Sequence, residues 1–204
     1  MKILSVFKKE LKTKRPLFAL ILLGVGGLGR LLLADLPNIE TVLVVSMLAG
    51  CMLGGLYTLF IPITVMAITD FQILGSFHPI FLATWSGFIF LGFIGYLLKN
   101  RRRASLGFIG ILLGAGLAGT VLFDFWTDIW WWYLMYPGHT LNNFIQVLML
   151  QIPFTLRHLL STAIFVPLVS VPLLYLYEHG WQATYSLIKG MLCRPSDAQY
   201  SAFR

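Results

Sequence analysis

Residues 41–71 read TVLVVSMLAGCMLGGLYTLFIPITVMAITDF, and Asp70 is the only charged residue among these 31. A helix needs about 20 apolar residues to cross the hydrocarbon core of a bilayer, so the stretch is too long for one untilted span. Gly50, Gly54 and Gly55 lie near its middle, where glycines favour a tight turn. The stretch is therefore either one tilted span or two short spans joined by a turn.

The distribution of basic residues decides between these two interpretations. Thirteen of the 15 lysines and arginines lie in three short segments, residues 2–15, 99–103 and 189–204. Short loops that are rich in lysine and arginine stay on the cytoplasmic side of a membrane. With a cytoplasmic N-terminus, two spans within 41–71 keep the run 99–103 inside, whereas one span places it outside. We therefore predict two spans, over 41–53 and 56–71.

The same reasoning, applied outward from this stretch, divides the rest of the chain. Residues 1–16 form a basic leader and 179–204 a tail, both predicted to be cytoplasmic. Residues 141–152 are apolar on one side and are followed by Pro153, which predicts an interfacial or re-entrant helix before the last span. The membrane domain over 17–178 then holds six predicted spans, over residues 17–33, 41–53, 56–71, 79–98, 104–123 and 156–177.

Composition supports this class of protein. Apolar residues make up 58% of the chain, charged residues 11%, and the mean hydropathy is +0.81. An average soluble domain has about 25% charged residues, so a soluble enzyme and a disordered chain are excluded. The net charge of +7 lies in loops rather than along one face, which argues against a nucleic-acid partner. The predicted fold is an all-α integral membrane protein of the cell (plasma) membrane, a compact bundle of six transmembrane helices.

Small residues recur at helical spacing in two of the predicted spans. Gly24 and Gly27 lie in the first, and Gly110, Gly114 and Ala118 follow one another every four residues in the fifth. Such spacing places small residues on one face, where it allows close approach of a second helix. That helix belongs either to this chain or to a partner. We retain both alternatives and name these five residues as candidates for partner docking.

Residues 123–133, FDFWTDIWWWY, hold four of the six tryptophans. Asp124 and Asp128 are four residues apart, so on a helix they share a face, together with Trp131. Two carboxylates beside aromatic rings can bind a flat polar or cationic organic molecule. A membrane-interface belt of aromatic residues explains the tryptophans equally well. The candidate ligand-binding residues are these and other polar side chains predicted on the outer side: Asn38, Asp124, Trp126, Asp128, Trp131, His139, Arg157 and His158.

Sequence motifs of catalysis are absent. The chain contains no H-E-x-x-H, no G-x-S-x-G and no phosphate-binding loop. We therefore expect no enzyme activity, no cofactor and no metal. A membrane enzyme that uses Asp124, Asp128 and His139 is one alternative, and a structural subunit that only packs against partners is another.

Three local patterns carry a family resemblance. They are PNIETVLVVSMLAG at residues 37–50, GTVLFDFWTD at 119–128 and IPFTLRHLLSTAIFVP at 152–167. With the chain length and the number of spans, they make the sequence similar to the substrate-binding S-components of energy-coupling factor vitamin transporters. The resemblance implies a subunit that captures a small vitamin-like organic ligand from outside. It also implies two kinds of partner, a transmembrane coupling subunit and ATPases.

Overall fold

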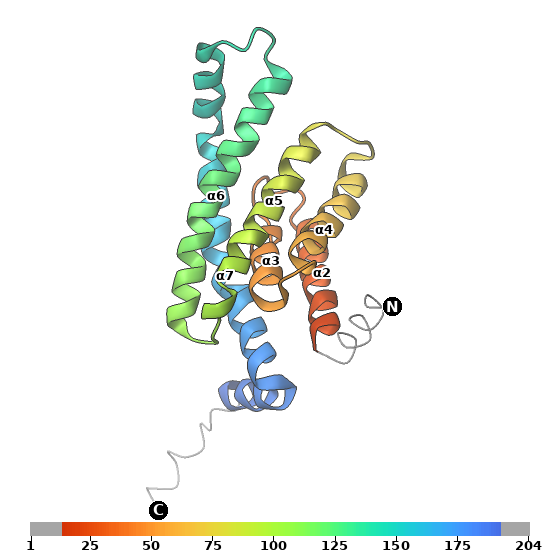
Figure 1. The fold of residues 1–204 in the computed structure, drawn as a ribbon, viewed down its shortest axis with the longest axis vertical. Coiled ribbons are helices and arrows are strands. Elements are labelled where there is room, and N and C mark those ends of the chain that lie inside the picture. The colour runs from red at the N-terminus through yellow and green to blue at the C-terminus, as the bar shows by residue number, and fades with distance from the viewer. Residues whose placement is uncertain (1–13, 193–204) are drawn as a thin grey trace, which may run out of the picture.

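The computed structural model describes residues 14–192, and every regular element in that range is a helix (Figure 1). Five helices are long and apolar enough to cross a membrane, as expected for a multi-pass membrane protein. Residues 1–13 of the predicted leader and 193–204 of the predicted tail lie outside the described residues. The helices, in chain order, are α2 (Arg15–Leu32), α3 (Val42–Leu48), the π-helix η1 (Ala49–Leu53), α4 (Tyr57–Leu74), α5 (Ile80–Leu97), the 3-10 helix η2 (Lys99–Arg101), α6 (Leu106–Met135) and α7 (Leu141–Leu192).

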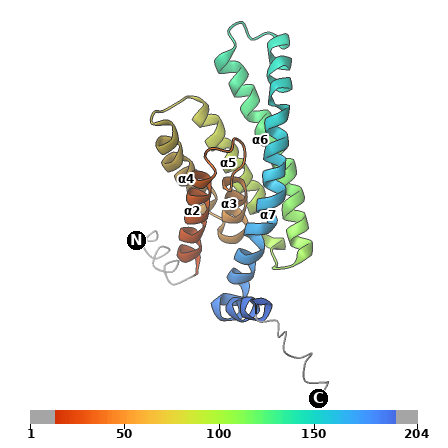
Figure 2. The same ribbon diagram turned by 180° about the vertical axis from the view of Figure 1, so that it is seen from behind.

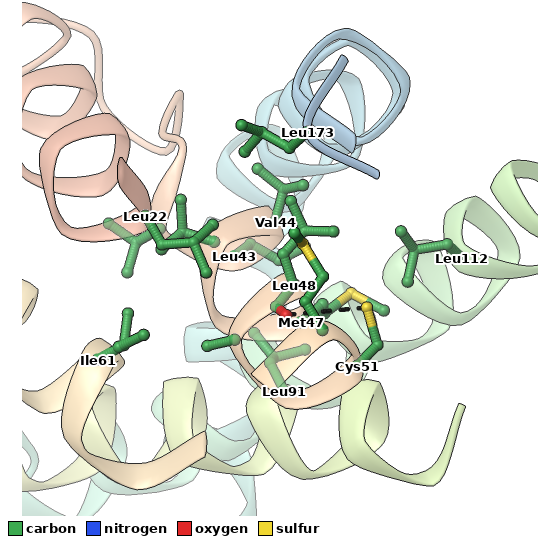
Figure 3. Packing of buried hydrophobic residues seen from close by; sticks show 14 of the residues in the cluster. Leu22, Leu43, Val44, Met47, Leu48, Cys51, Ile61, Leu91, Leu112 and Leu173 are labelled. Atoms are coloured by element: carbon green, nitrogen blue, oxygen red, sulfur yellow. Dashed lines mark hydrogen bonds between the residues drawn. The ribbon is translucent and has the colours of Figure 1, made fainter. Parts of the chain in front are cut away.

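The segment Val42–Leu53, which forms α3 and η1, is the centre of the bundle. Its 12 residues are all buried, and at 1.5 Å per residue they extend only about 18 Å, less than the roughly 30 Å of a hydrocarbon core. The predicted span over 41–53 is therefore a short helix enclosed by protein rather than a helix exposed to lipid. Figure 3 shows side chains of this segment packed among residues of the surrounding helices: Leu22, Ile61, Leu91, Leu112 and Leu173.

Glycines bring this central segment into direct backbone contact with α5. A Cβ atom added to Gly95 would lie 2.0 Å from the carbonyl oxygen of Met47, and one added to Gly50 would lie 2.0 Å from that of Gly92. Neither position has room for a side chain. The glycines of residues 41–71 thus serve close packing as well as the turn, where Gly54 and Gly55 both have positive φ.

Two residues of the basic run 99–103 bind the C-terminal end of the central segment. Lys99 Nζ donates to the carbonyl of Leu53 at 3.2 Å, and Arg102 donates to the carbonyls of Cys51 and Met52 at 3.1 and 2.9 Å. The last carbonyls of a helix lack partners inside the helix and carry a partial negative charge. These two cations therefore cap η1, a structural role that the charge rule for membrane loops did not predict.

Helices α6 and α7 form a hairpin that extends beyond the tips of α4 and α5 (Figures 1 and 2). Helix α6 continues past residue 123, where its predicted span ends, and the aromatic segment forms its last turns. Helix α7 continues through Pro153, so the predicted helix end there is wrong, and residues 141–152 are the first turns of α7 rather than a separate helix. This segment packs against α6, where the ring centroids of Phe125 and Phe144 are 6.2 Å apart. The packing keeps the segment helical despite the proline.

Successive segments of the bundle run in alternating directions. The start of α2 and the end of α7 therefore lie at the same end, the lower end in Figure 1, near η2 and its basic residues. Six passes through the bundle, one of them the short central segment, produce this arrangement. Helix α7 changes direction at Gly180, where φ is 80°.

Candidate ligand-binding cavity

A cavity of about 350 Å³ lies between the loop 33–40 and helices α2, α4, α5, α6 and α7. Its volume falls within the range of small-molecule pockets, roughly 300–1,000 Å³. Loop 33–40 connects α2 to the buried start of α3, which brings Asn38 and Glu40 to the cavity wall. The polar lining residues are Arg30, Asn38, Glu40, Thr84, Asp124, Thr127, Asp128, Gln151, Thr155 and His158.

Arg30 is the centre of an ion-pair network on one side of the cavity. Its two terminal nitrogens lie 2.8 Å from Glu40 Oε2 and 2.5 Å from Asp70 Oδ1. Trp85 Nε1 donates to the other Asp70 oxygen at 2.7 Å. The network therefore joins α2, the loop, α4 and α5 through charged groups that are mostly removed from solvent.

His158 connects this network to α6. Its Nδ1 lies 2.8 Å from Asp124 Oδ1, and its Nε2 lies 3.5 Å from Glu40 Oε1. Ser161, one turn later on α7, accepts a hydrogen bond from the Glu40 backbone N–H at 2.9 Å and donates to the Glu40 carbonyl at 3.1 Å. Glu40 is thus fixed by both its backbone and its carboxylate.

Glu40 lies in the loop, and its electrostatic surroundings favour the ionised form. Burial alone raises the pKa of its carboxyl, but the ring nitrogen of His158 and the positive charge of Arg30 outweigh burial. The pKa of Glu40 therefore lies below its ordinary value of 4.5. At neutral pH this residue is a carboxylate, as its ion pair with Arg30 requires.

Asp124 and Asp128 are the least satisfied acids of the cavity. The exposed fractions of the two residues are 6% and 7%. Asp124 Oδ2 is buried and has no hydrogen-bond partner, and within residues 14–180, whose side chains the structure describes, no hydrogen bond or ion pair reaches the Asp128 carboxylate. Burial of a carboxylate oxygen without a partner costs desolvation free energy. The unpartnered carboxylate oxygens of Asp124 and Asp128 therefore favour a ligand that would pair with them.

The structure brings together five of the eight candidate ligand-binding residues. The cavity wall includes Asn38, Asp124, Asp128, Trp131 and His158. The three carried by α6 are spaced i, i+4 and i+7, which places them on one helical face. Their grouping therefore has a simple cause in the sequence.

The other three candidates lie elsewhere. Trp126, two residues from Asp124 and so on another face of α6, donates to the Ala83 carbonyl at 3.2 Å and to Ser86 Oγ at 3.1 Å on α5. His139 lies at the α6–α7 turn, stacked on Tyr133 with ring centroids 5.0 Å apart. Arg157 is exposed, and its Cζ atom lies 5.9 Å from the Phe154 ring centroid. The alternative catalytic set of Asp124, Asp128 and His139 therefore does not line one cavity.

Sequence reasoning missed the roles of Arg30, Glu40 and Asp70. Asp35, five residues after Arg30, was the nearer partner in sequence, but Arg30 pairs with Glu40 and Asp70 instead. The available signal was that Arg30 and Asp70 interrupt long apolar stretches, since charged groups inside membrane segments usually pair with one another. Among the described residues, no three His, Cys, Asp or Glu side chains are placed to hold a metal ion.

The five candidate docking residues face away from the bundle interior. A Cβ atom added at Gly24, Gly27, Gly110 or Gly114 would have no atom within 4 Å, and Ala118 is exposed. Gly116 and Gly119 on α6 face inward instead, because an added Cβ would meet Thr162 at 3.2 Å and Leu91 at 2.5 Å. Internal packing therefore uses other glycines than the five.

Comparison with curated proteins and with solved structures finds no match. A family model described as "Family of unknown function (DUF6580)" matches residues 9–180. The match includes loop 33–40 and every residue that lines the cavity. The description names no activity, so the resemblance to S-components stays a prediction. Because the match covers most of its length, the chain belongs to this family of unknown function, DUF6580.

Proposed function

We propose that the chain is the substrate-capture subunit of an uptake transporter in the plasma membrane, similar to an S-component. The cavity would receive a small organic molecule at the outer face. The observation that carries this proposal is the pair of buried acids, Asp124 and Asp128, that line a cavity of about 350 Å³. Oδ2 of Asp124 has no hydrogen-bond partner, and no hydrogen bond or ion pair of the described side chains reaches the Asp128 carboxylate.

Energetic cost supports a binding role for the polar network. Charged side chains are expensive inside a membrane protein and generally face a cavity or a transport path. Apolar residues of similar volume often stabilise a protein as well as a buried ion pair does, or better. A bundle that only packed against partners would need neither the cavity nor the four acids around it, Glu40, Asp70, Asp124 and Asp128.

Loop 33–40 supports access from one end of the bundle. Its residues Ala34, Leu36 and Pro37 line the cavity and are also exposed. Displacement of this one short loop would admit a molecule without separating the helices. We place this end outside the cell, because the basic run 99–103 lies at the other end, and we place both termini in the cytoplasm.

The energy for uptake would come from other proteins. The sequence has no phosphate-binding loop, so the proposal includes separate ATPases and a transmembrane coupling subunit. The open small-residue face of α6, formed by Gly110, Gly114 and Ala118, is the candidate docking surface. Gly24 and Gly27 on α2 provide a second one.

The test is native mass spectrometry of the full chain, purified in mild detergent from cells that are grown in rich medium. We expect a small organic molecule bound to the wild-type protein and absent from Asp128→Asn. The matched control is Asp35→Asn, which changes an exposed acid outside the cavity and should retain the ligand. A ligand-free wild-type protein, or a ligand that Asp128→Asn retains fully, would contradict the proposal.

A further inference from the structure

We infer that the cavity selects an organic cation, whose ammonium or amidinium group pairs with Asp124 and Asp128. The inference rests on the proposed capture function and names the class of molecule that is captured. Its basis is the charge balance of the cavity and the position of the two carboxylates on α6.

Carboxyl groups outnumber cationic groups in the polar network and beside it. Glu40, Asp70 and Asp124 belong to the network, and Asp128 lies one helical turn from Asp124. The only cationic groups among the described residues of the network are Arg30 and, when doubly protonated, His158. With all four carboxyl groups ionised, even a doubly protonated His158 leaves an excess of two carboxylates, and a bound monocation would compensate one of them.

The two cationic side chains of the network, Arg30 and His158, contact other acids than Asp128. Arg30 contacts Glu40 and Asp70, on the opposite side of the network. His158 contacts Oδ1 of Asp124, which leaves Oδ2 of that residue buried and unpartnered. The acceptors without a partner among the described residues are therefore the buried Asp124 Oδ2 and the Asp128 carboxylate, and both residues line the cavity one helical turn apart.

The surroundings of these acceptors suit a planar cation. Trp131 lies one turn beyond Asp128 on the same helix and also lines the cavity, and tryptophan is the best aromatic partner for a cation. Amidinium and guanidinium groups present parallel N–H donors that match a carboxylate in two hydrogen bonds. An anion would meet an excess of carboxyl groups, and a neutral molecule would leave the Asp128 carboxylate without a cationic partner.

Three probes of nearly equal size and shape test the charge preference: benzamidine, benzamide and benzoate, which are positive, neutral and negative at neutral pH. Binding to the full chain in lipid nanodiscs is measured by isothermal titration calorimetry. We expect benzamidine to bind at least 10-fold more tightly than benzamide, and benzoate not to bind. Asp128→Asn should weaken benzamidine binding by about 10- to 150-fold, the range for a hydrogen bond to a charged group, and leave benzamide unchanged.

The exposed acid Asp35 provides the matched control, since Asp35→Asn removes the same charge outside the cavity and should leave all three affinities unchanged. Benzamide or benzoate binding as tightly as benzamidine would overturn the cation inference but leave the capture function standing. Binding of none of the probes, or of Mg²⁺ in place of benzamidine, would also overturn the inference. The capture function fails separately, through ligand-free wild-type protein in the mass spectrum. If Asp128→Asn fails to fold, the wild-type affinity order alone decides the matter.

Discussion

Arg30 shows how much one partly buried cation can determine in an apolar bundle. It holds loop 33–40 against α4 through its contacts to Glu40 and Asp70, and the loop in turn forms one wall of the cavity. Removing one partner from a buried ion pair leaves an uncompensated charge. Arg30 therefore stabilises both the fold and the binding site, although it contacts neither Asp124 nor Asp128.

Replacement of Arg30 tests this role. We expect Arg30→Leu to lower the free energy of unfolding by about 3–5 kcal/mol, because it leaves Glu40 and Asp70 buried without their cation. Arg157→Leu is the control, since Arg157 is exposed and its printed contact is with the Phe154 ring; it should change stability by about 0.5 kcal/mol or less. Thermal and denaturant unfolding in mild detergent measure both. Equal stability of the two variants would show that the network contributes little.

Close packing of helices is the dominant feature at the scale of elements. The short segment of α3 and η1 is in backbone contact with α5 at Gly50, Gly92 and Gly95, and Lys99 and Arg102 cap its end. The outer face of α6 presents its small residues to the surroundings instead. The glycines thus divide into an inner set, which the fold requires, and an outer set, which the fold leaves free.

This division predicts opposite results for two substitutions. Gly95→Ala should destabilise the protein by about 1–3 kcal/mol or more, because its Cβ would lie 2.0 Å from the Met47 carbonyl oxygen. The much larger change Gly114→Leu should leave folding and ligand retention intact, because nothing lies within 4 Å of the added Cβ. Size-exclusion profiles and thermal unfolding compare the two. A stable Gly95→Ala variant would contradict the packing argument.

The Gly114→Leu variant also tests partner docking. If α6 docks a coupling subunit through its small-residue face, a bulky side chain there blocks close approach of the second helix. We expect loss of uptake in membrane vesicles that contain the ATPase module, with ligand binding retained. Normal uptake by this variant would assign docking to another surface, such as α2.

At the scale of the whole molecule, the chain passes through the bundle six times and has both described ends at the same side (Figures 1 and 2). The cavity is near the opposite side, beneath loop 33–40. Helix α6, with 30 residues, is about 45 Å long and exceeds the roughly 30 Å of a hydrocarbon core. Helix α6 is therefore longer than an untilted span requires, and its last turns carry the aromatic segment.

Cysteine labelling in intact cells tests the proposed orientation. In a background that lacks Cys51 and Cys193, a membrane-impermeant thiol reagent should modify Gly138→Cys at the α6–α7 turn and spare Asn100→Cys in η2. Permeabilised cells provide the control, because there both positions should react. Modification of Asn100→Cys in intact cells would reverse the orientation and place the cavity on the cytoplasmic side.

The apolar spans, the turn within residues 41–71 and the direction of successive segments were predictable from the sequence. Hydrophobic length and the positions of basic residues are local properties that do not depend on packing. The shared face of Asp124, Asp128 and Trp131 was predictable for the same reason, because spacing along one helix fixes it. Helical spacing also predicts that Trp126 lies on another face of α6. Its clustering in sequence with the other tryptophans wrongly suggested that it belongs to the same site.

Other features depended on contacts between residues far apart in the chain. The local sequence of residues 41–53 fits a short span in lipid as well as a helix enclosed by protein. The glycines of α5, which allow close backbone contact with this segment, decide that it is enclosed. Pro153 reads as a helix end, yet packing on α6 carries α7 through it. Arg30 pairs across 40 residues with Asp70 rather than with Asp35 nearby. Tertiary structure decided these features because buried charges and closely packed backbones contact residues that are distant in the sequence. Local sequence patterns describe only residues that are close along the chain.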